Sequence, residues 1–446
     1  MAELLKNGAN IYKSGLKAEY ASYDEIRKIQ SCRLIESVRY AYNKSPFYRR
    51  YYRENGFHPD EIRSVDDIER IPFINRKILG ENYAEITAVS GSRIIDINAT
   101  SGTTGKPLYI PMTAGDLRLF SGLCARGFSY WNIGKNDTAQ MMLSSDNLII
   151  ASRILGTALE KHIGSTTLRV GPVGTERQIT IMKDLKPDVM IGVSSYFLSL
   201  GRRLEEMGFD PGKELNIKTL FSTASVTYHS GWKAMTATKE FSRIWNAPVC
   251  SILGTTESCV GFFSCPASMG HHIHWDHIIA EIIDPKTGKV LPAGQSGELV
   301  ISFCGREAFP LIRYRTSDIT TIETEKCDCG RTNHRIMAIT GRIDEMVQIK
   351  GRLIFPIQIE EAVLPIPGVV NHLVEVVTDE GGMDQIVVTL GVDCEEDGIK
   401  ETAAENIKSA THVTPVIKID NPENIEKVWF REQRRVPRKF WDKRGS

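Results

Sequence analysis

The order of apolar and polar positions over the first third of the chain is helical. Residues 1–90 have the pattern of charged helices, and within 23–52 the apolar side chains recur at steps of three and four. Thr113 and Asp116 then form a predicted capping box, in which each side chain bonds the backbone N–H of the other at the start of a helix. The stripe of residues that follows is predicted to face the core: Leu117, Phe120, Cys124, Phe128 and Trp131.

The middle of the chain changes to short apolar runs. Runs at 189–193, 220–223 and 249–253 are typical of buried strands, and helical patterns at 196–207 and 229–241 separate them. This alternation predicts a parallel sheet covered by helices. Ligands of such sheets bind at the carboxyl ends of the strands, so we expect functional residues directly after these runs.

From residue 273 onward the pattern predicts hairpins. Apolar stretches at 279–283 and 297–302 flank a turn sequence, Asp-Pro-Lys-Thr-Gly. The predicted fold class is therefore α/β. We expect a large N-terminal domain over 1–340, with parallel sheets, helices and a β-hairpin-rich subdomain, followed by a small α+β C-terminal domain over 341–446.

Composition excludes several classes of protein. Hydrophobic residues make up 41% and charged residues 25% of the 446, which is typical of a globular protein. The 55 Lys and Arg balance the 55 Asp and Glu, so charge gives no reason to expect a nucleic-acid or membrane partner. No apolar run approaches the ~20 residues of a membrane span, and the start lacks a signal-peptide core. We expect a cytoplasmic protein whose nine cysteines are mostly reduced.

The stretch richest in candidate chemistry is 100–107, Thr-Ser-Gly-Thr-Thr-Gly-Lys-Pro. Glycines allow a tight turn whose N–H groups approach an anion, hydroxyls add donors, and lysine adds a positive charge. This composition predicts a phosphate-binding loop, although the spacing differs from that of a Walker A loop. A solvated turn is the alternative if the loop is considered alone.

Three further motifs follow in order. They are Leu-Gly-Thr-Thr-Glu at 253–257, Arg-Tyr-Arg-Thr-Ser-Asp at 313–318 and Gly-Arg-Ile-Asp-Glu at 341–345. Together with the loop at 100–107 and Ser-Pro-Phe-Tyr at 45–48, they resemble the adenylate-forming (ANL) superfamily, in particular its phenylacetate–CoA ligase branch. The resemblance extends from about residue 20 to the end of the chain.

The resemblance implies a role for each motif. Lys106 would hold the ATP phosphates, Glu257 would bind Mg²⁺, Asp318 would accept hydrogen bonds from the ribose, and Arg342 would reach phosphate or ribose. Asp344 would be the hinge about which a mobile C-terminal domain rotates. The predicted catalytic residues are Lys106, Glu257, Arg342 and Asp344. The predicted nucleotide-binding residues are Ser101, Gly102, Thr103, Thr104, Gly105, Lys106, Ala224, Ser225, Thr256, Glu257, Asp318 and Arg342.

The acid is expected to bind around Tyr196, Phe197, Leu253 and Gly254, and the aromatic rings there favour an aromatic acid. Two segments depart from the family pattern. Leu253 stands where most relatives have tyrosine, and Thr-Ala-Ser at 223–225 replaces Gly-Ala-Glu. Relatives use both segments at the adenine and the acyl group, so we expect a differently shaped site.

The C-terminal tail also departs from the pattern. Relatives carry a lysine there that bridges the carboxylate and the α-phosphate, whereas this chain has Val436 at the corresponding position. Arg435 or Lys439 are the candidate substitutes. An arginine would present a planar fork instead of a compact ammonium group, so that exchange would not be neutral.

A cysteine and histidine cluster predicts a metal. Cys265, His272, Cys327 and Cys329 match a pattern found in phenylacetate–CoA ligase relatives, and three thiolates with one imidazole would make a structural zinc site. His271, His274 and His277 compete with His272 as the imidazole ligand, and the alternative is a set of small buried thiols.

Three functions follow from these observations. The first is an AMP-forming ligase that joins an aromatic carboxylic acid to CoA through an acyl-adenylate, using ATP and Mg²⁺. The second transfers the adenylate to an amine or hydroxyl acceptor instead. The third is a nucleotide-binding protein without adenylation. We expect a small-molecule acid as partner, no nucleic acid and no membrane, with a homodimer as one open assembly.

Overall fold

The computed structural model describes most of the chain: residues 11–100, 107–144, 150–171, 173–223, 227–228, 230–267, 269–349, 352–379, 382–392, 398–429 and 438–444. These residues form two compact units. The large unit contains the described residues up to 316 together with 320–338, and the small unit contains 317–319 and the described residues from 339 onward. Among them, no helix is both long and apolar enough to cross a membrane.

The N-terminal helices match the predicted pattern with one break. Helix α3 (Tyr23–Lys44) begins at a capping box formed by Ser22 and Glu25. It stops at Ser45, which caps the next helix, because Pro46 at the first position of α4 (Pro46–Glu54) lacks the N–H that would continue α3. The helices before and after them are α2 (Ile11–Ala18) and α5 (Arg76–Ile86).

A two-stranded sheet leads into the predicted capping box. Strand β1 (Ile94–Ala99) pairs antiparallel with β2 (Tyr109–Thr113) on either side of the predicted phosphate loop. Thr113 and Asp116 form the capping box of α6 (Ala114–Ser129), which confirms that prediction. Three members of the predicted stripe on α6, including Phe120 and Phe128, are fully buried.

The largest sheet has nine strands in the order β13-β14-β9-β8-β7-β6-β5-β3-β4. Its parallel part is β4 (Thr166–Arg169), β3 (Thr138–Met141), β5 (Val189–Gly192), β6 (Thr219–Thr223) and β7 (Val249–Leu253). The antiparallel part is β8 (Phe262–Ser264), β9 (His271–His272), β14 (Arg335–Ile336) and β13 (Ile322–Glu323). The predicted runs at 189–193, 220–223 and 249–253 are thus neighbouring parallel strands.

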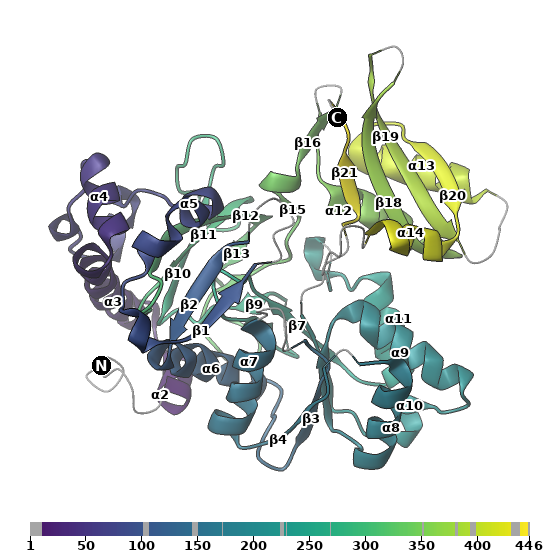
Figure 1. The fold of residues 1–446 in the computed structure, drawn as a ribbon, viewed down its shortest axis with the longest axis horizontal. Coiled ribbons are helices and arrows are strands. Elements are labelled where there is room, and N and C mark those ends of the chain that lie inside the picture. Colours follow the sequence, from purple (N-terminus) through teal and green to yellow (C-terminus); the bar gives the residue numbers. More distant parts are fainter. Residues whose placement is uncertain are drawn as a thin grey trace. The chain divides into compact units, whose positions relative to one another are not determined.

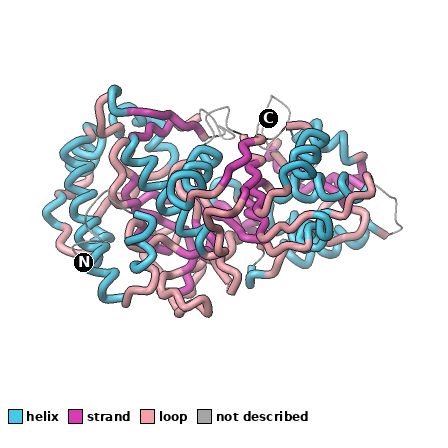
Figure 2. The backbone as a smooth tube through the Cα atoms, turned by 90° about the horizontal axis from the view of Figure 1, so that it is seen from below, coloured by secondary structure: helices cyan, strands magenta, loops and turns pink. Residues whose placement is uncertain are grey.

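Helices cover both faces of the parallel strands (Figures 1 and 2). Val189 and Ile191 of β5 lie in the core that α6 shares, whereas Met190 between them lies in a second core with α9 and α11. The helices around these strands are α7 (Ile150–Thr157), which continues as a π-helix over Ala158–Ile163, α8 (Thr175–Leu185), α9 (Ser194–Glu206), α10 (Pro211–Glu214) and α11 (Thr236–Trp245).

The helix predicted over 229–241 begins later than the apolar pattern suggested. A 3₁₀ turn at Ser230–Trp232 precedes α11, which starts only at Thr236. Gly231 (φ 71°) and Trp232 (φ 58°) both adopt left-handed backbone, which a right-handed helix cannot include. The early start of this predicted helix is therefore wrong.

The predicted hairpin region is confirmed. Strand β10 (Ile278–Ile283) pairs antiparallel with β11 (Gly297–Phe303), and the same sheet contains β12 (Leu311–Thr320) and β15 (Gly341–Arg342) in the order β10-β11-β12-β15.

The small unit has its own core around a four-stranded sheet of order β20-β19-β18-β21. The elements after β15 are β16 (Val347–Ile349), β17 (Arg352–Ile354), α12 (Pro356–Val363), β18 (Val369–Thr378), β19 (Asp384–Val392), α13 (Ile399–Thr411), β20 (Val416–Asp420), α14 (Pro422–Trp429) and β21 (Phe440–Asp442). Mixed parallel and antiparallel pairing with helices agrees with the α+β expectation.

Candidate active site

A tight turn after β7 positions Glu257. Gly254 opens the turn, and a Cβ at this position would meet the carbonyl oxygen of Val260 at 2.7 Å, so only glycine fits there. Thr255 and Ser258 close the turn, since the Ser258 N–H donates to Thr255 Oγ1 (3.1 Å) and the Ser258 hydroxyl donates to the Thr255 carbonyl (2.9 Å). The Glu257 side chain is held at the carboxyl end of a parallel strand, as the sequence predicts.

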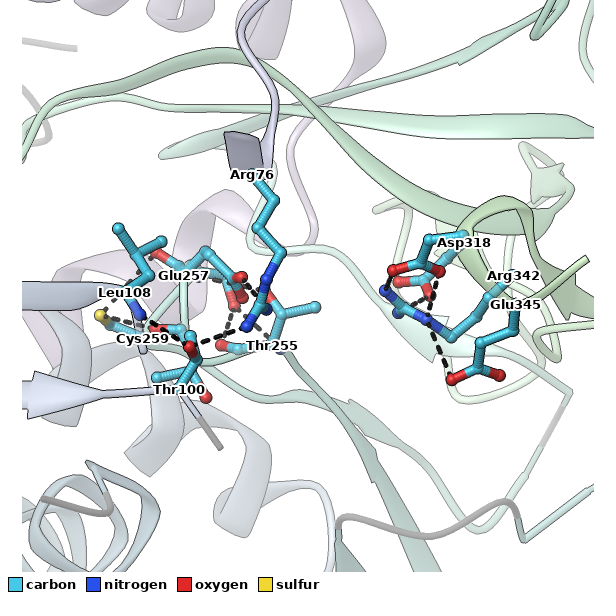
Figure 3. A network of polar contacts seen from close by, with 12 residues as sticks. Arg76, Thr100, Leu108, Thr255, Glu257, Cys259, Asp318, Arg342 and Glu345 are labelled. Atoms are coloured by element: carbon cyan, nitrogen blue, oxygen red, sulfur yellow. Dashed lines mark hydrogen bonds and ion pairs between the residues drawn. The ribbon is translucent and has the colours of Figure 1, made fainter. Parts of the chain in front are cut away.

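Arg76 forms an ion pair with the Glu257 carboxylate. Its Nη1 lies 2.9 Å from Glu257 Oε1, and its Nη2 donates to Thr100 Oγ1 at 2.8 Å (Figure 3). Glu257 is only 4% exposed, whereas the Arg76 side chain is 32% exposed. Thr100 Oγ1 also accepts from the Leu108 N–H (3.0 Å), which ties the two ends of the predicted phosphate loop together. No sequence motif marks Arg76, which precedes Glu257 by 181 residues.

A second arginine supports the backbone of this turn. Arg306 is buried and donates from Nη1 to the Glu257 carbonyl at 2.6 Å and from Nη2 to Cys259 Sγ at 3.6 Å. Its guanidinium lies near the rings of Phe120 and Phe303, 5.3 and 5.6 Å from their centroids. A charged group in these surroundings fixes the turn by direct hydrogen bonds. Arg306 also lies outside every recognisable sequence motif.

Glu257 fits a hard cation. Magnesium prefers oxygen ligands, and this carboxylate lies beside the Thr100 hydroxyl. The positive guanidinium of Arg76 at Glu257 Oε1 shows that the position accepts a cation.

Asp318, the last residue of the motif at 313–318, meets the motif at 341–345 in the small unit. Asp318 of β12 lies opposite Arg342 of β15 in the strand register, and Arg342 Nη1 donates to Asp318 Oδ1. Arg342 also forks onto Asp344, with Nε to Oδ1 and Nη2 to Oδ2 both at 3.1 Å, and lies 3.9 Å from Glu345 (Figure 3). Burial opposes the charge on Arg342, but the carboxylates of Asp318 and Asp344 outweigh it and raise its pKa.

Three cysteines and His272 converge in the large unit. Their ligand atoms all lie within 4.8 Å of one another. Cys265 Sγ is 3.6 Å from Cys327 Sγ, and Cys329 Sγ is 3.6 Å from His272 Nε2. Ligands about 2.1–2.3 Å from one tetrahedral zinc would be separated by about 3.5–3.8 Å, so these residues fit the ion.

The imidazole of this cluster is oriented by its other nitrogen. His272 Nδ1 donates to Asn333 Oδ1 at 2.8 Å, which leaves Nε2 facing the sulfurs. The competing histidines bond elsewhere: His271 to Ser251, His274 to Gly261 and His277 to Cys304. Hydrogen bonds from Cys265 and His272 lower the pKa of the Cys329 thiol below its ordinary value, so this thiol ionises readily.

The residues predicted to bind the acid have different surroundings in the fold. Phe197 is fully buried in the core of α9, with its ring 5.7 Å from that of Phe241, so it packs the core instead of lining an opening. Tyr196 is half-buried and donates to the Val173 carbonyl at 2.8 Å. Leu253 and Gly254 do lie at the end of β7, next to Glu257.

Different aromatic side chains gather near β7. Tyr228 stacks on Trp232 with ring centroids 4.4 Å apart, and Trp232 meets His271 edge to face at 4.9 Å. His271 Nε2 lies 2.9 Å from the hydroxyl of Ser251 in β7. Burial lowers the pKa of His271 to about 4, so the ring is neutral at pH 7. Neither Tyr228 nor Trp232 belongs to a recognisable sequence motif.

Several predicted residues lie outside the described part of the chain: Ser101, Gly102, Thr103, Thr104, Gly105, Lys106, Ala224, Ser225, Arg435 and Val436. Thr256 is described, and its carbonyl accepts from Cys259 Sγ at 3.2 Å. Lys439, a candidate for the missing lysine, donates from Nζ to Glu360 Oε1 at 2.9 Å. A role at the α-phosphate would require Lys439 to leave Glu360.

Comparison with known proteins identifies the family. The family described as "AMP-binding enzyme" matches residues 43–305, more than half of the chain. The chain belongs to the AMP-binding enzyme family. A second family, described as "AMP-binding enzyme C-terminal domain", matches residues 351–444. The resemblance drawn from the motifs is thereby confirmed.

Curated relatives cover nearly the whole chain. A phenylacetate-coenzyme A ligase of Aromatoleum evansii is 31% identical over 94% of this chain and 95% of its own length. One of Thermus thermophilus is 32% identical over 86% of this chain and 84% of its own. The fold matches a crystal structure of 2-hydroxyisobutyryl-CoA ligase in its postadenylation state with a TM-score of 0.83 and 23% identity. The match covers 96% of this chain and 91% of the ligase.

Proposed function

We propose that this AMP-binding enzyme is an AMP-forming ligase that converts a carboxylic acid to an acyl-adenylate with ATP and then to a CoA thioester. The observation that carries the proposal is the buried Glu257 after β7, which shares the guanidinium of Arg76 with Thr100. In the sequence, Thr100 directly precedes the hydroxyls, glycines and Lys106 of the loop at 101–106. Relatives named phenylacetate-coenzyme A ligase, which share about a third of their residues with this chain, support CoA as acceptor.

Adenylation needs the carboxylate held in line with the α-phosphate and positive charge on the phosphate oxygens. We assign phosphate binding to the hydroxyls, N–H groups and Lys106 of the loop at 101–106, and ribose binding to Asp318. Magnesium, when bound, neutralises the triphosphate, and Glu257 would hold it. Arg342 would bind phosphate or ribose, and Asp318 and Asp344 orient its guanidinium.

The second half-reaction, thioester formation, needs a different face of the C-terminal domain at the adenylate. We propose that the domain over 341–446 rotates relative to 1–340 about Asp344. Asp344 lies in the short 3₁₀ turn Ile343–Glu345 between β15 and β16, where a small backbone change would redirect everything that follows.

The cluster of Cys265, His272, Cys327 and Cys329 would hold a structural zinc. Four protein ligands leave no open position for chemistry, so the ion would stabilise the fold. It would fix the turn at 327–331 against the N-terminal segment, because Arg331, two residues after Cys329, donates to Glu19 at 2.9 Å.

We propose an aromatic acid as substrate. Two features support this choice: the names of the curated relatives, and the aromatic group of Tyr228, Trp232 and His271 beside β7. Planar rings of this kind would pack against an aryl group.

Pyrophosphate release across a panel of aromatic and aliphatic acids, with and without CoA, tests the proposal. An increase with one aromatic acid that grows with CoA would support it. Release that depends on an acid but ignores CoA would point to an amine or hydroxyl acceptor. Silence across the panel with ATP still bound would contradict adenylation.

A further inference from the structure

The contact between Arg76 and Glu257 links two features that the motifs treat separately. Glu257 is the buried carboxylate proposed to hold magnesium, and Thr100 is the residue directly before the phosphate loop. One guanidinium bonds both of them, with Nη1 at 2.9 Å from Glu257 Oε1 and Nη2 at 2.8 Å from Thr100 Oγ1 (Figure 3). A positive group therefore lies directly at the carboxylate.

The base of Arg76 is fixed while its tip can move. The backbone of Ile74 forms two hydrogen bonds with β12. Its N–H donates to the Arg313 carbonyl at 3.1 Å, and its carbonyl accepts from the Arg315 N–H at 2.8 Å. Asn75 then caps α5 by accepting from the Ile78 N–H at 3.0 Å. Beyond this anchor, the Arg76 side chain is 32% exposed and reaches the site on a long flexible stem.

Arg76 and a divalent cation compete for Glu257. Like charges repel strongly at ion-pair distance, and the attraction of each for the carboxylate increases where water is excluded. Glu257 has a side chain that is only 6% exposed, so little solvent screens the two cations from each other. A guanidinium displaced from Glu257 would lie beside the triphosphate, whose oxygens match its planar fork of donors.

We infer that Arg76 is the resident counterion of Glu257 in the nucleotide-free enzyme and transfers to the triphosphate when magnesium and ATP bind. This inference rests on the proposed function for the identity of the nucleotide. It predicts opposite effects of one substitution: without Arg76, the divalent cation binds more tightly and the triphosphate binds more weakly.

The test measures binding without turnover. Free Mn²⁺ is titrated into the full-length protein, without nucleotide, and followed by electron paramagnetic resonance. Arg76→Gln should bind Mn²⁺ at least threefold more tightly than wild type. In calorimetry at saturating Mg²⁺ without acid, Arg76→Gln should bind ATP about tenfold or more weakly, the loss expected for one hydrogen bond between charged groups, and AMP unchanged.

Two variants guard the interpretation. Arg76→Lys keeps the charge but loses the fork, so its Mn²⁺ affinity should stay near that of wild type while ATP binding falls in part. Arg202→Gln removes another arginine of the large unit, whose Nη2 lies 2.8 Å from Glu240 Oε1 and which has no contact with Glu257. This control should change neither affinity.

The two steps of the inference fail separately. Unchanged Mn²⁺ affinity in Arg76→Gln would refute the counterion role, and unchanged ATP affinity would refute the transfer. If Arg76→Gln does not fold, Arg76→Lys decides, because unchanged ATP affinity in that variant also contradicts the transfer. Failure of the proposed function is a distinct result, since it appears as absence of acid-dependent pyrophosphate release from the wild type.

Discussion

Replacing Asp318 by alanine tests the nucleotide site most simply. The Asp318 carboxylate is 6% exposed and is assigned to the two ribose hydroxyls. A hydrogen bond to a charged group contributes about 1.5–3 kcal/mol. Two of them would give more, but in the free enzyme Asp318 already pairs with Arg342, so part of that gain is offset. We expect a net loss of about 3 kcal/mol, or roughly 100-fold in affinity.

Folding should be almost unaffected by this change. Arg342 keeps its two bonds to Asp344 at 3.1 Å and its contact with Glu345, so no buried cation is left alone. Loss of one partly exposed pair contributes about 1 kcal/mol or less. Urea unfolding should therefore show little change while calorimetry shows a large one.

The assay is calorimetric titration with ATP and with AMP, which share the ribose. Both affinities should fall equally in Asp318→Ala, unlike the ATP-specific effect expected for Arg76. Glu345→Gln is the matched control, because it removes another carboxylate near Arg342 that is not assigned to the ribose. The reasoning is refuted if Asp318→Ala binds both nucleotides within twofold of wild type, or if Glu345→Gln weakens them as much.

Three further predictions follow from other parts of the structure. Elemental analysis should find one zinc per chain, and Cys327→Ser should lose the metal and unfold at lower temperature with Asp318 still binding nucleotide; a wild type without zinc would contradict the site. Asp276→Asn should cost about 3–5 kcal/mol at pH 7, because Arg126 bonds both carboxylate oxygens (2.8 and 3.1 Å) in a fully buried pair. Despite burial, Arg126 holds the pKa of Asp276 well below its usual range, so the pair's contribution to stability is complete above pH ~4 and is lost as the pH falls further. The difference in unfolding free energy between wild type and variant, measured with urea, should therefore shrink by about 1 kcal/mol at pH 3. An unchanged difference would contradict this. Asp344→Pro should fix one orientation and spare only one half-reaction, whereas equal loss of pyrophosphate release and thioester formation would count against the hinge.

Much of the fold could be predicted because local pattern and tertiary structure agree. The strand over Val189–Gly192 is apolar throughout, and the strand over Val249–Leu253 is apolar except for Ser251, because helices cover both faces of these strands. The start of α11 could not be placed, because the left-handed backbone at Gly231 and Trp232 depends on tertiary contacts that the apolar period does not report.

The site divides in the same way. Glu257 follows a strand and Asp318 lies within one, both in recognisable motifs. His272 was the predicted imidazole ligand, with its neighbouring histidines as competitors. Arg76 and Arg306 were missed because each reaches the Glu257 turn from a distant segment with no motif of its own. Phe197 was assigned to the acid because an aromatic after a strand has the same pattern whether it lines a pocket or packs a core.

The most direct test of the central claim, an acyl-adenylate, follows oxygen atoms. The acid that stimulates pyrophosphate release is labelled with ¹⁸O in both carboxyl oxygens and incubated with ATP, Mg²⁺, CoA and the enzyme. Attack of the carboxylate on the α-phosphate transfers one labelled oxygen to AMP when the thioester forms, and mass spectrometry should find AMP heavier by one ¹⁸O. Unlabelled AMP, or ADP with the label in orthophosphate, would contradict the account.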